Sequence, residues 1–456
     1  MNRMMSRRLV MAFPLVLACI GLTDCGGKPS TTTVFPPSTA ISVKRYTAGG
    51  QLDKANFGGG TGAVATKIDP SEFEYALAVA LQPTDNKMIA AGHSALAGQG
   101  VIALVRYNAN GTLDSAPGSF GSGGIVRTAV GSDNVEAVAV AVQADGKIVV
   151  AGTLLAPDFS GKGVALLRYN ANGTLDTTFG GTGIVTRTIG TGSDTAAAAL
   201  ALQVDGKIVV AGHAFTGTKT DIVLLRYNAN GTLDSVPGSF GNRGIVITAL
   251  TSNAAALAIQ LQPADNKIVA AGSVGNFSDS SMDAVLLRYN TDGTLDTTTF
   301  GVGGIVQTDI GSGNNFANAI ALQPADGKIV VAGHANVNFL LDTSDIALLR
   351  YDANGSPETT FGGVPQGKVV TNLGGFDNAF SVGLQSSDGK IVVSGNTGFA
   401  GSFPGVAVLR YDASGALDPT FGTGGVVTTP ATGPSTIASG NAVLIHPDGI
   451  VVAGYD

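Results

Sequence analysis

One dipeptide recurs along this chain at a nearly constant interval. Arg-Tyr occurs seven times, 58 to 62 residues apart, with its arginine first at Arg45 and last at Arg410. A Phe-Gly pair follows each copy in register, from Phe57 to Phe421. A repeat of this length indicates one supersecondary unit, which cannot bury its apolar surface alone and must stack on its neighbours. We therefore expect one repeat domain, although 456 residues alone would suggest two or three domains.

Each repeat has the pattern of four short β-strands, labelled A to D in chain order. Two turns of the repeat contain Asp-Gly or Asn-Gly, as at Gly146 and Gly173, and these dipeptides supply the positive φ that a tight hairpin needs. Val, Ile and small residues dominate the segments between the turns, which favours strands over helices. In one repeat the strands are expected at residues 138–143, 147–152, 164–169 and 184–186.

The two ends of the chain contain complementary halves of one repeat. Residues 41–64 supply only strands C and D, and residues 443–454 supply only strands A and B. Pairing the two halves would close a ring and protect its sheet edges. The sequence therefore predicts an all-β fold over residues 41–456, a closed seven-bladed β-propeller. Its blades have four strands, and the N-terminal strands complete the last blade.

The repeat also resembles a known family. Its unit is Leu-Gln-Pro-Asp-Gly-Lys-Ile-Val-Val-Ala-Gly, then Leu-Leu-Arg-Tyr-Asn-Ala-Asn-Gly-Thr-Leu-Asp, then Phe-Gly and Gly-Ile-Val. This unit resembles the delta-60 repeat family of bacterial surface and secreted proteins, over residues 41–456. The resemblance implies a β-propeller in an exported protein. It implies no catalytic activity, because the family has no assigned chemistry or catalytic residues to carry over.

The N-terminal segment has the layout of an export signal. Three arginines within the first eight residues precede an apolar run at residues 9–18, which is too short for a permanent membrane span. We expect a signal peptide at residues 1–24 and a flexible linker at 25–40. Cys19 lies in a lipobox-like context and is the expected lipid anchor, with Cys25 as the alternative. If neither is lipidated, both are removed with the signal, and the protein is a secreted rather than lipid-anchored component of the bacterial cell envelope.

Charge and composition limit the classes of partner. The formal net charge is −7, and lysine and arginine are not clustered after the first eight residues. A nucleic-acid partner is therefore not expected. Tryptophan is absent, which removes a common stacking residue for sugars. The expected partner is a protein or glycan of unknown identity, with the membrane reached only through the lipid anchor.

Residues that recur in every repeat are interpreted as fold residues. Each arginine of the Arg-Tyr pair is followed by an acid, and we expect an ion pair that braces the connection between strands C and D. The tyrosines and phenylalanines are expected to pack between blades. The lysines that follow the A–B turn are interpreted as solvated. The acids are Asp53, Asp114, Asp176, Asp234, Asp296, Glu358 and Asp418.

Functional residues are expected where the repeats differ. The B–C and D–A loops share one face of a propeller, and the D–A loops end in polar side chains that would surround the channel mouth. These side chains could hold Ca²⁺ or a polar ligand; alternatively, each closes a turn before strand A. The candidate residues are Glu74, Asp133, Asn134, Asp194, Asn253, Asn314 and Asp377.

No catalytic residue and no other metal site is expected. His93, His213 and His334 fall in alternate blades, too far apart to share a metal ion. No Ser-His-Asp set stands apart from the repeat. The predicted function is a non-enzymatic binding scaffold without a cofactor other than possible Ca²⁺. The alternative is a Ca²⁺-dependent hydrolase or lyase with its site at the mouth of the central channel.

Overall fold

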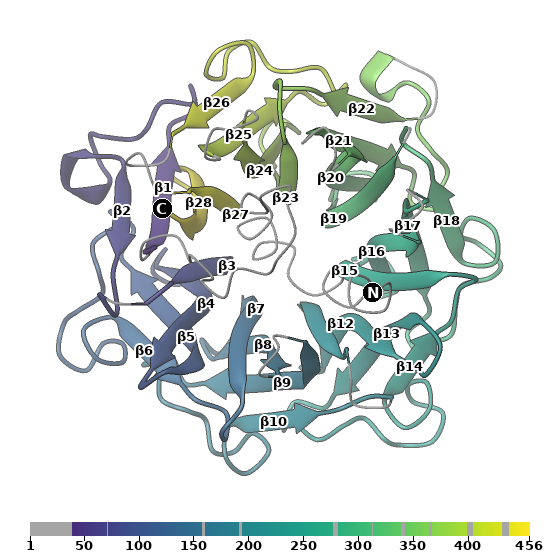
Figure 1. Cartoon of the computed structure of the whole chain (residues 1–456), viewed down its shortest axis with the longest axis horizontal. Helices are drawn as coiled ribbons and strands as arrows, with labels where there is room; N and C mark the ends of the chain where they lie inside the picture. The colour runs from purple at the N-terminus through teal and green to yellow at the C-terminus, as the bar shows by residue number, and fades with distance from the viewer. Residues whose placement is uncertain are drawn as a thin grey trace, which may run out of the picture.

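Figure 1 shows the protein as a ring of sheets around a central axis. Within the part of the chain that the structure describes, 28 strands form seven four-stranded antiparallel sheets, which confirms the predicted seven-bladed β-propeller. The predicted signal peptide and both cysteines lie outside the described residues. This computed structural model describes residues 39–70, 72–156, 160–190, 194–276, 281–311, 313–338, 343–363, 367–398, 405–430 and 437–456.

Each blade follows the order A, B, C, D from the axis outward, and blade 1 joins the two ends of the chain. Blade 1 contains β27 (Ser439–His446), β28 (Gly449–Tyr455), β1 (Ile41–Tyr46) and β2 (Ala63–Thr66). Blade 2 contains β3 (Tyr75–Leu81), β4 (Met88–Leu96), β5 (Gln99–Tyr107) and β6 (Ile125–Thr128). Blade 3 contains β7 (Asn134–Val142), β8 (Ile148–Leu155), β9 (Gly161–Tyr169) and β10 (Ile184–Arg187).

The remaining blades repeat this arrangement. Blade 4 contains β11 (Ala196–Leu202), β12 (Ile208–Phe215), β13 (Thr220–Tyr227) and β14 (Ile245–Thr248). Blade 5 contains β15 (Asn253–Leu261), β16 (Ile268–Gly275), β17 (Asp283–Tyr289) and β18 (Ile305–Thr308). Blade 6 contains β19 (Asn314–Leu322), β20 (Ile329–Asn338), β21 (Thr343–Tyr351) and β22 (Lys368–Thr371). Blade 7 contains β23 (Asn378–Leu384), β24 (Ile391–Thr397), β25 (Gly405–Tyr411) and β26 (Val426–Thr429). Within the described residues, short 3₁₀ turns occur in two C–D connections, η1 (Gly58–Gly60) and η3 (Phe361–Gly363).

Strand A is longer than its sequence pattern predicts. In blade 3 it begins at Asn134 rather than at residue 138, and its pairing with β8 shifts between Ala137 and Ala139. The β-bulge at this point inserts one extra residue and interrupts the alternation of side chains. Strict alternation of inward and outward side chains holds only after the bulge, so the sequence pattern predicts only that half of the strand.

The bulge explains why a glycine recurs within strand B. The sequence pattern places this glycine at the end of the strand, but β4 continues past Gly92 to Leu96 and β8 continues past Gly152 to Leu155. In blade 2 the bulge carries the strand A backbone close to Gly92. A Cβ atom at this glycine would lie 1.9 Å from the carbonyl oxygen of Tyr75. Any side chain at this position would collide with the neighbouring strand. Glycine is therefore required by close backbone approach.

The apolar core lies between blades. Strands B and C are buried along almost their whole length, and their Val, Ile and Leu side chains contact the sheets on both sides. Between blades 2 and 3, Ile102 and Leu104 share one buried cluster with Val135 and Val150. Each blade therefore depends on both neighbours for burial of its apolar surface.

The ring closes as the complementary terminal halves predict. The pairing of β1 with β28 runs from Ile41 opposite Tyr455 to Tyr46 opposite Ile450. The backbone nitrogen of Ala40 also donates to the carbonyl oxygen of Asp456 at 3.1 Å. The Thr39 hydroxyl donates to the carbonyl oxygen of Glu74 at 2.7 Å. The last two residues of the predicted linker, 39 and 40, therefore contact the folded domain.

The helical segments of the described residues are short 3₁₀ turns. None of them is long and apolar enough to cross a bilayer.

Candidate functional site

The two faces of the ring carry different connections. We call the face with the B–C and D–A loops the loop face, and the face with the A–B hairpins and C–D connections the turn face. Strand directions fix this division, because successive strands in each blade are antiparallel. The repeated polar residues lie on the turn face, and the candidate site residues lie toward the loop face.

On the turn face, the predicted arginine–acid ion pairs are confirmed in all seven blades. In blade 2 the Nε atom of Arg106 donates to Asp114 at 2.7 Å, and its guanidinium lies 4.4 Å from the centre of the Phe120 ring. The same guanidinium donates to the carbonyl oxygen of Ala171 in blade 3. Each arginine therefore links a C–D connection to the next blade. The pairs are Arg45–Asp53, Arg106–Asp114, Arg168–Asp176, Arg226–Asp234, Arg288–Asp296, Arg350–Glu358 and Arg410–Asp418.

The lysines after the A–B turns form ion pairs, so the interpretation of these side chains as merely solvated is wrong. In blade 2 the Nζ atom of Lys87 lies 3.1 Å from the arginine-paired Asp114 and 3.5 Å from Asp85 of its own hairpin. Five further lysines repeat this arrangement in blades 3 to 7. The lysine thus ties the A–B hairpin to the C–D connection of the same blade.

On the loop face, two predicted site residues accept hydrogen bonds from the backbone of their own D–A loops. The carboxylate of Glu74 is fully buried and accepts hydrogen bonds from the backbone nitrogens of Ile68 and Asp69 at 2.8 and 2.7 Å. Asp377 is also fully buried and accepts from the backbone nitrogen of Leu373 at 2.7 Å, and burial raises its pKa. These contacts are those that the turn-closing interpretation predicts.

Three predicted asparagines link neighbouring blades instead. Each is the first residue of a strand A, and its side-chain oxygen accepts a hydrogen bond from the backbone near the start of strand C in the preceding blade. These amides hold strands of adjacent blades in register. The pairs are Asn134 with Gly100 at 2.8 Å, Asn253 with Thr220 at 3.0 Å and Asn314 with Met282 at 3.2 Å.

The remaining two predicted residues differ from these. Asp133 is half-buried and forms an ion pair with Lys162, near the start of β9 in blade 3. Asp194 has a left-handed backbone, with φ of 61°, and its carbonyl oxygen accepts from the backbone nitrogen of Phe215 at 3.2 Å. Over the described residues, no group of three or more His, Cys, Asp or Glu is placed to hold a metal ion. In the described part of the chain, the acids among the candidate residues therefore do not converge on a common point.

Of the three histidines of alternate blades, His213 and His334 are buried and His93 is half-buried, all near the loop face. Burial lowers the pKa of His93 and of His213 to about 4, and that of His334 to about 3. Desolvation disfavours the charged imidazolium, so all three rings are neutral at pH 7. At that pH they act as uncharged hydrogen-bonding or packing groups.

A polar and aromatic cluster on this face was missed by the sequence reasoning. The Tyr75 hydroxyl of blade 2 donates to the Glu136 carboxylate of blade 3 at 2.6 Å. The His93 ring stacks on Tyr75 with centroids 5.2 Å apart, and the half-buried Phe73 lies 5.6 Å from Tyr75 and 6.0 Å from Tyr455 of blade 1. We call these five residues the loop-face cluster. Burial raises the pKa of both Glu136 and Tyr75.

A signal for this cluster exists in the sequence. When the repeats are aligned on the recurrent glycine of strand B, one residue of each strand A falls at a common register position. Glu136 is the acid at that position, and the others are neutral. The set is Tyr75, Glu136, Ala196, Ala255, Phe316, Asn378 and Ser439.

The repeats match a described sequence family, "Domain of unknown function (DUF5122) beta-propeller". Each matching segment runs from an A–B hairpin to the C–D connection of one of blades 2 to 7. The chain is a β-propeller repeat protein. The matching segments are residues 84–116, 143–179, 203–235, 264–298, 325–361 and 386–421.

Solved structures resemble this propeller in fold alone. Sqt1 from Chaetomium thermophilum is 13% identical, with a TM-score of 0.45 and coverage of 84% of this chain and 94% of that one. The periplasmic gluconolactonase PpgL of Pseudomonas aeruginosa is 13% identical, with a TM-score of 0.45 and coverage of 80% and 87%. An ulvan lyase of polysaccharide lyase family PL25 is 12% identical, with a TM-score of 0.44 and coverage of 74% and 80%. No curated protein sequence matches the chain.

The loop-face cluster gives this propeller a site with specific chemistry. A buried carboxyl, a phenol and a neutral imidazole lie in contact, and the phenylalanine ring beside them is partly open to solvent. Aromatic rings next to hydrogen-bonding groups are the usual content of protein and carbohydrate binding surfaces. The cluster is therefore our candidate functional site.

Proposed function

We propose that the propeller is a binding module of the delta-60 repeat kind, exported to the bacterial cell envelope, whose loop face holds a protein or a glycan. One observation supports this function most strongly. Side chains that recur in every blade serve the turn face and the contacts between blades, whereas the unrepeated aromatic and polar side chains of blades 1 to 3 gather on the loop face. Residues that differ between repeats can recognise one particular partner, and loops on a rigid scaffold commonly carry such residues.

The patch that would contact a partner includes two apolar side chains of blade 2. Phe73 is half-buried above the loop-face cluster, and Leu96, at the end of β4, is 41% exposed. The B–C loops that surround such a patch differ in length and sequence between blades. Apolar anchors within a polar rim are the usual composition of an interface.

The proposal is tested by binding measurements with the double variant Phe73→Ser, Leu96→Ser. Biolayer interferometry against a panel of soluble polysaccharides and peptidoglycan fragments, together with cross-linking to purified envelope proteins, should identify a partner. We expect the double variant to bind this partner at least about tenfold more weakly, a loss of roughly 1.4 kcal/mol. A matched control is Val204→Ser, Val302→Ser on the turn face, where the two valines are 91% and 87% exposed.

Two results would contradict the binding module. Loss of binding in the turn-face control but not in the loop-face variant would place the interface on the other side of the ring. Release of shortened chains from a polysaccharide in the presence of Ca²⁺ would instead favour the alternative, a Ca²⁺-dependent hydrolase or lyase.

Envelope attachment through Cys19, or through Cys25 as the alternative, is part of the same proposal. A lipid-modified cysteine carries acyl chains that partition into the bilayer. Mass spectrometry of the N-terminal peptide from cells that express Cys19→Ala or Cys25→Ala is expected to show loss of acylation in only one variant. An unmodified peptide from the unaltered protein would end this part of the proposal.

A further inference from the structure

One contact between blades departs from the repeat. At six interfaces the last residue of strand D is a threonine whose hydroxyl bonds to the Arg-Tyr tyrosine of the next blade. At the interface of blades 3 and 4 this position is Arg187, the last residue of β10. The hydroxyl of Tyr227 in blade 4 is buried there and has no hydrogen-bond partner among the described residues. The fold therefore loses a hydrogen bond that every other interface has.

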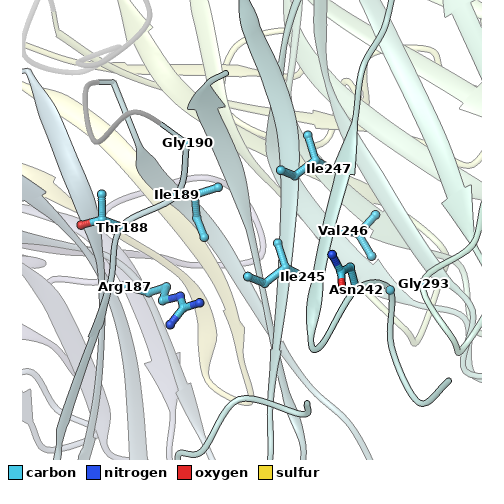
Figure 2. A pocket seen from close by; sticks show the side chains of 10 residues that line it. Arg187, Thr188, Ile189, Gly190, Asn242, Ile245, Val246, Ile247 and Gly293 are labelled. Carbon is cyan, nitrogen blue, oxygen red and sulfur yellow. The ribbon is translucent and has the colours of Figure 1, made fainter. Parts of the chain in front are cut away.

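A pocket lies beside this departure, on the outer wall of the ring. Figure 2 shows the Arg187 side chain extending toward Ile245 of β14, with Ile189 and Ile247 on the same hollow. The pocket has a volume of about 590 Å³, which lies within the range of small-molecule sites. We call it the rim pocket.

The rim pocket combines one cation with apolar walls. Arg187 is exposed, and it forms no ion pair within the part of the chain that the structure describes. Ile247 is 48% exposed. Asn242 and Thr188 add polar groups at the margins. A guanidinium with free donors recognises a carboxylate or phosphate through two parallel hydrogen bonds.

We propose that the rim pocket binds a small organic anion, with its acidic group on Arg187 and a short apolar body against Ile189, Ile245 and Ile247. The arginine supplies charge complementarity. Ile245 and Ile247 are more exposed than Ile189, which is 5% exposed, and they release water when the apolar body covers them. The missing threonine–tyrosine bond supports this assignment, because local rules of a fold are broken most often at functional sites. This site does not depend on the proposed function of the loop face.

Calorimetry of the full chain with two probes, octanoate and octyl phosphate, tests the rim pocket. We expect at least one probe to bind at least about tenfold more tightly than acetate, inorganic phosphate or 1-octanol, which each supply only half of the ligand. Tighter binding of octanoate identifies a carboxylate ligand, and tighter binding of octyl phosphate identifies a phosphate ligand.

The decisive variant is Arg187→Thr. It removes the cation and restores the residue that bonds to the tyrosine at the other interfaces. We expect binding to weaken at least about tenfold while the unfolding temperature rises, so the loss cannot result from misfolding. The matched control is Arg127→Thr on β6, which makes the same charge change at a strand D outside the pocket. No binding of either probe at millimolar concentration, or equal effects of the two variants, would overturn the proposal.

Discussion

At the scale of single residues, the glycine of each Asn-Gly turn meets two demands at once. Gly111 has a φ of 82°, which is unfavourable for residues with a side chain, and its α-carbon also faces the Phe57 ring of the preceding blade. A Cβ atom there would lie 2.7 Å from that ring. The turn and the blade-to-blade packing therefore require glycine for independent reasons.

The two demands can be separated by experiment. Gly98 has a φ of 81°, but a Cβ atom there would meet nothing within 4 Å. Gly98→Ala should therefore carry only the backbone cost, about 1–2 kcal/mol. Gly111→Ala should lose about 1–3 kcal/mol more, because the added methyl group displaces the Phe57 ring. Urea unfolding of both variants measures the difference, and equal losses would show that the ring contact contributes nothing.

At the scale of elements, three charges join two connections in each blade. In blade 4 the carboxylate of Asp234 lies 2.8 Å from Arg226 and 3.2 Å from Lys207 of the A–B hairpin, and it is 3% exposed. Interaction with the two cations and with Ser239 lowers its pKa against the opposing effect of burial. One carboxylate thus compensates two cations beneath a C–D connection.

Removing that charge should be costly. Asp234→Asn leaves Arg226 buried without its counter-ion, and the expected loss of unfolding free energy is about 3–5 kcal/mol. The control is Asp205→Asn in the same blade, where the aspartate is 53% exposed and lies 3.8 Å from Lys207. That exposed pair is worth less than about 1 kcal/mol. Denaturant titration distinguishes the two; a loss of under 1 kcal/mol for Asp234→Asn would contradict the bracing role.

The sequence predicts these elements to different extents. The arginine–acid pairs are readable because the partners lie eight residues apart and the interval recurs. The lysine contacts are not evident from the sequence, because Lys87 and Asp114 are far apart along the chain and meet only when β4 pairs with β5. The contact of Tyr75 with Glu136 joins different blades, so it depends on how sheets pack and is hidden from the pattern of either strand.

At the scale of the whole molecule, the number of blades follows from the repeat, but the special surfaces do not. Seven units and two complementary ends determine a closed ring. The rim pocket is formed by residues of blades 3, 4 and 5, including Arg187 and Gly293. The repeat pattern reveals only the residues that the blades share. The rim pocket depends on residues that differ between blades, so the pattern does not predict it.

Ring closure leads to a prediction about where the chain can be opened. The folded domain begins and ends at one place, because Ala40 and Asp456 exchange two backbone hydrogen bonds at 3.1 and 3.2 Å. A circular permutant that joins residue 456 to residue 39 through a short Gly-Ser linker and opens between Ala97 and Gly98 keeps every strand pair. The new ends fall in an exposed hairpin turn. Its unfolding free energy should stay within about 2 kcal/mol of the parent, because the connection is short and flexible.

Deletion of residues 39–66 is the informative counterpart of this permutant. It removes β1 and β2 and leaves β28 as an unpaired, apolar edge. Since each blade is buried by both neighbours, we expect loss of cooperative unfolding together with concentration-dependent association. Circular dichroism during urea titration and light scattering measure the two effects. A deletion variant that unfolds as one cooperative, monomeric unit would show that pairing of the two termini does not hold the ring together.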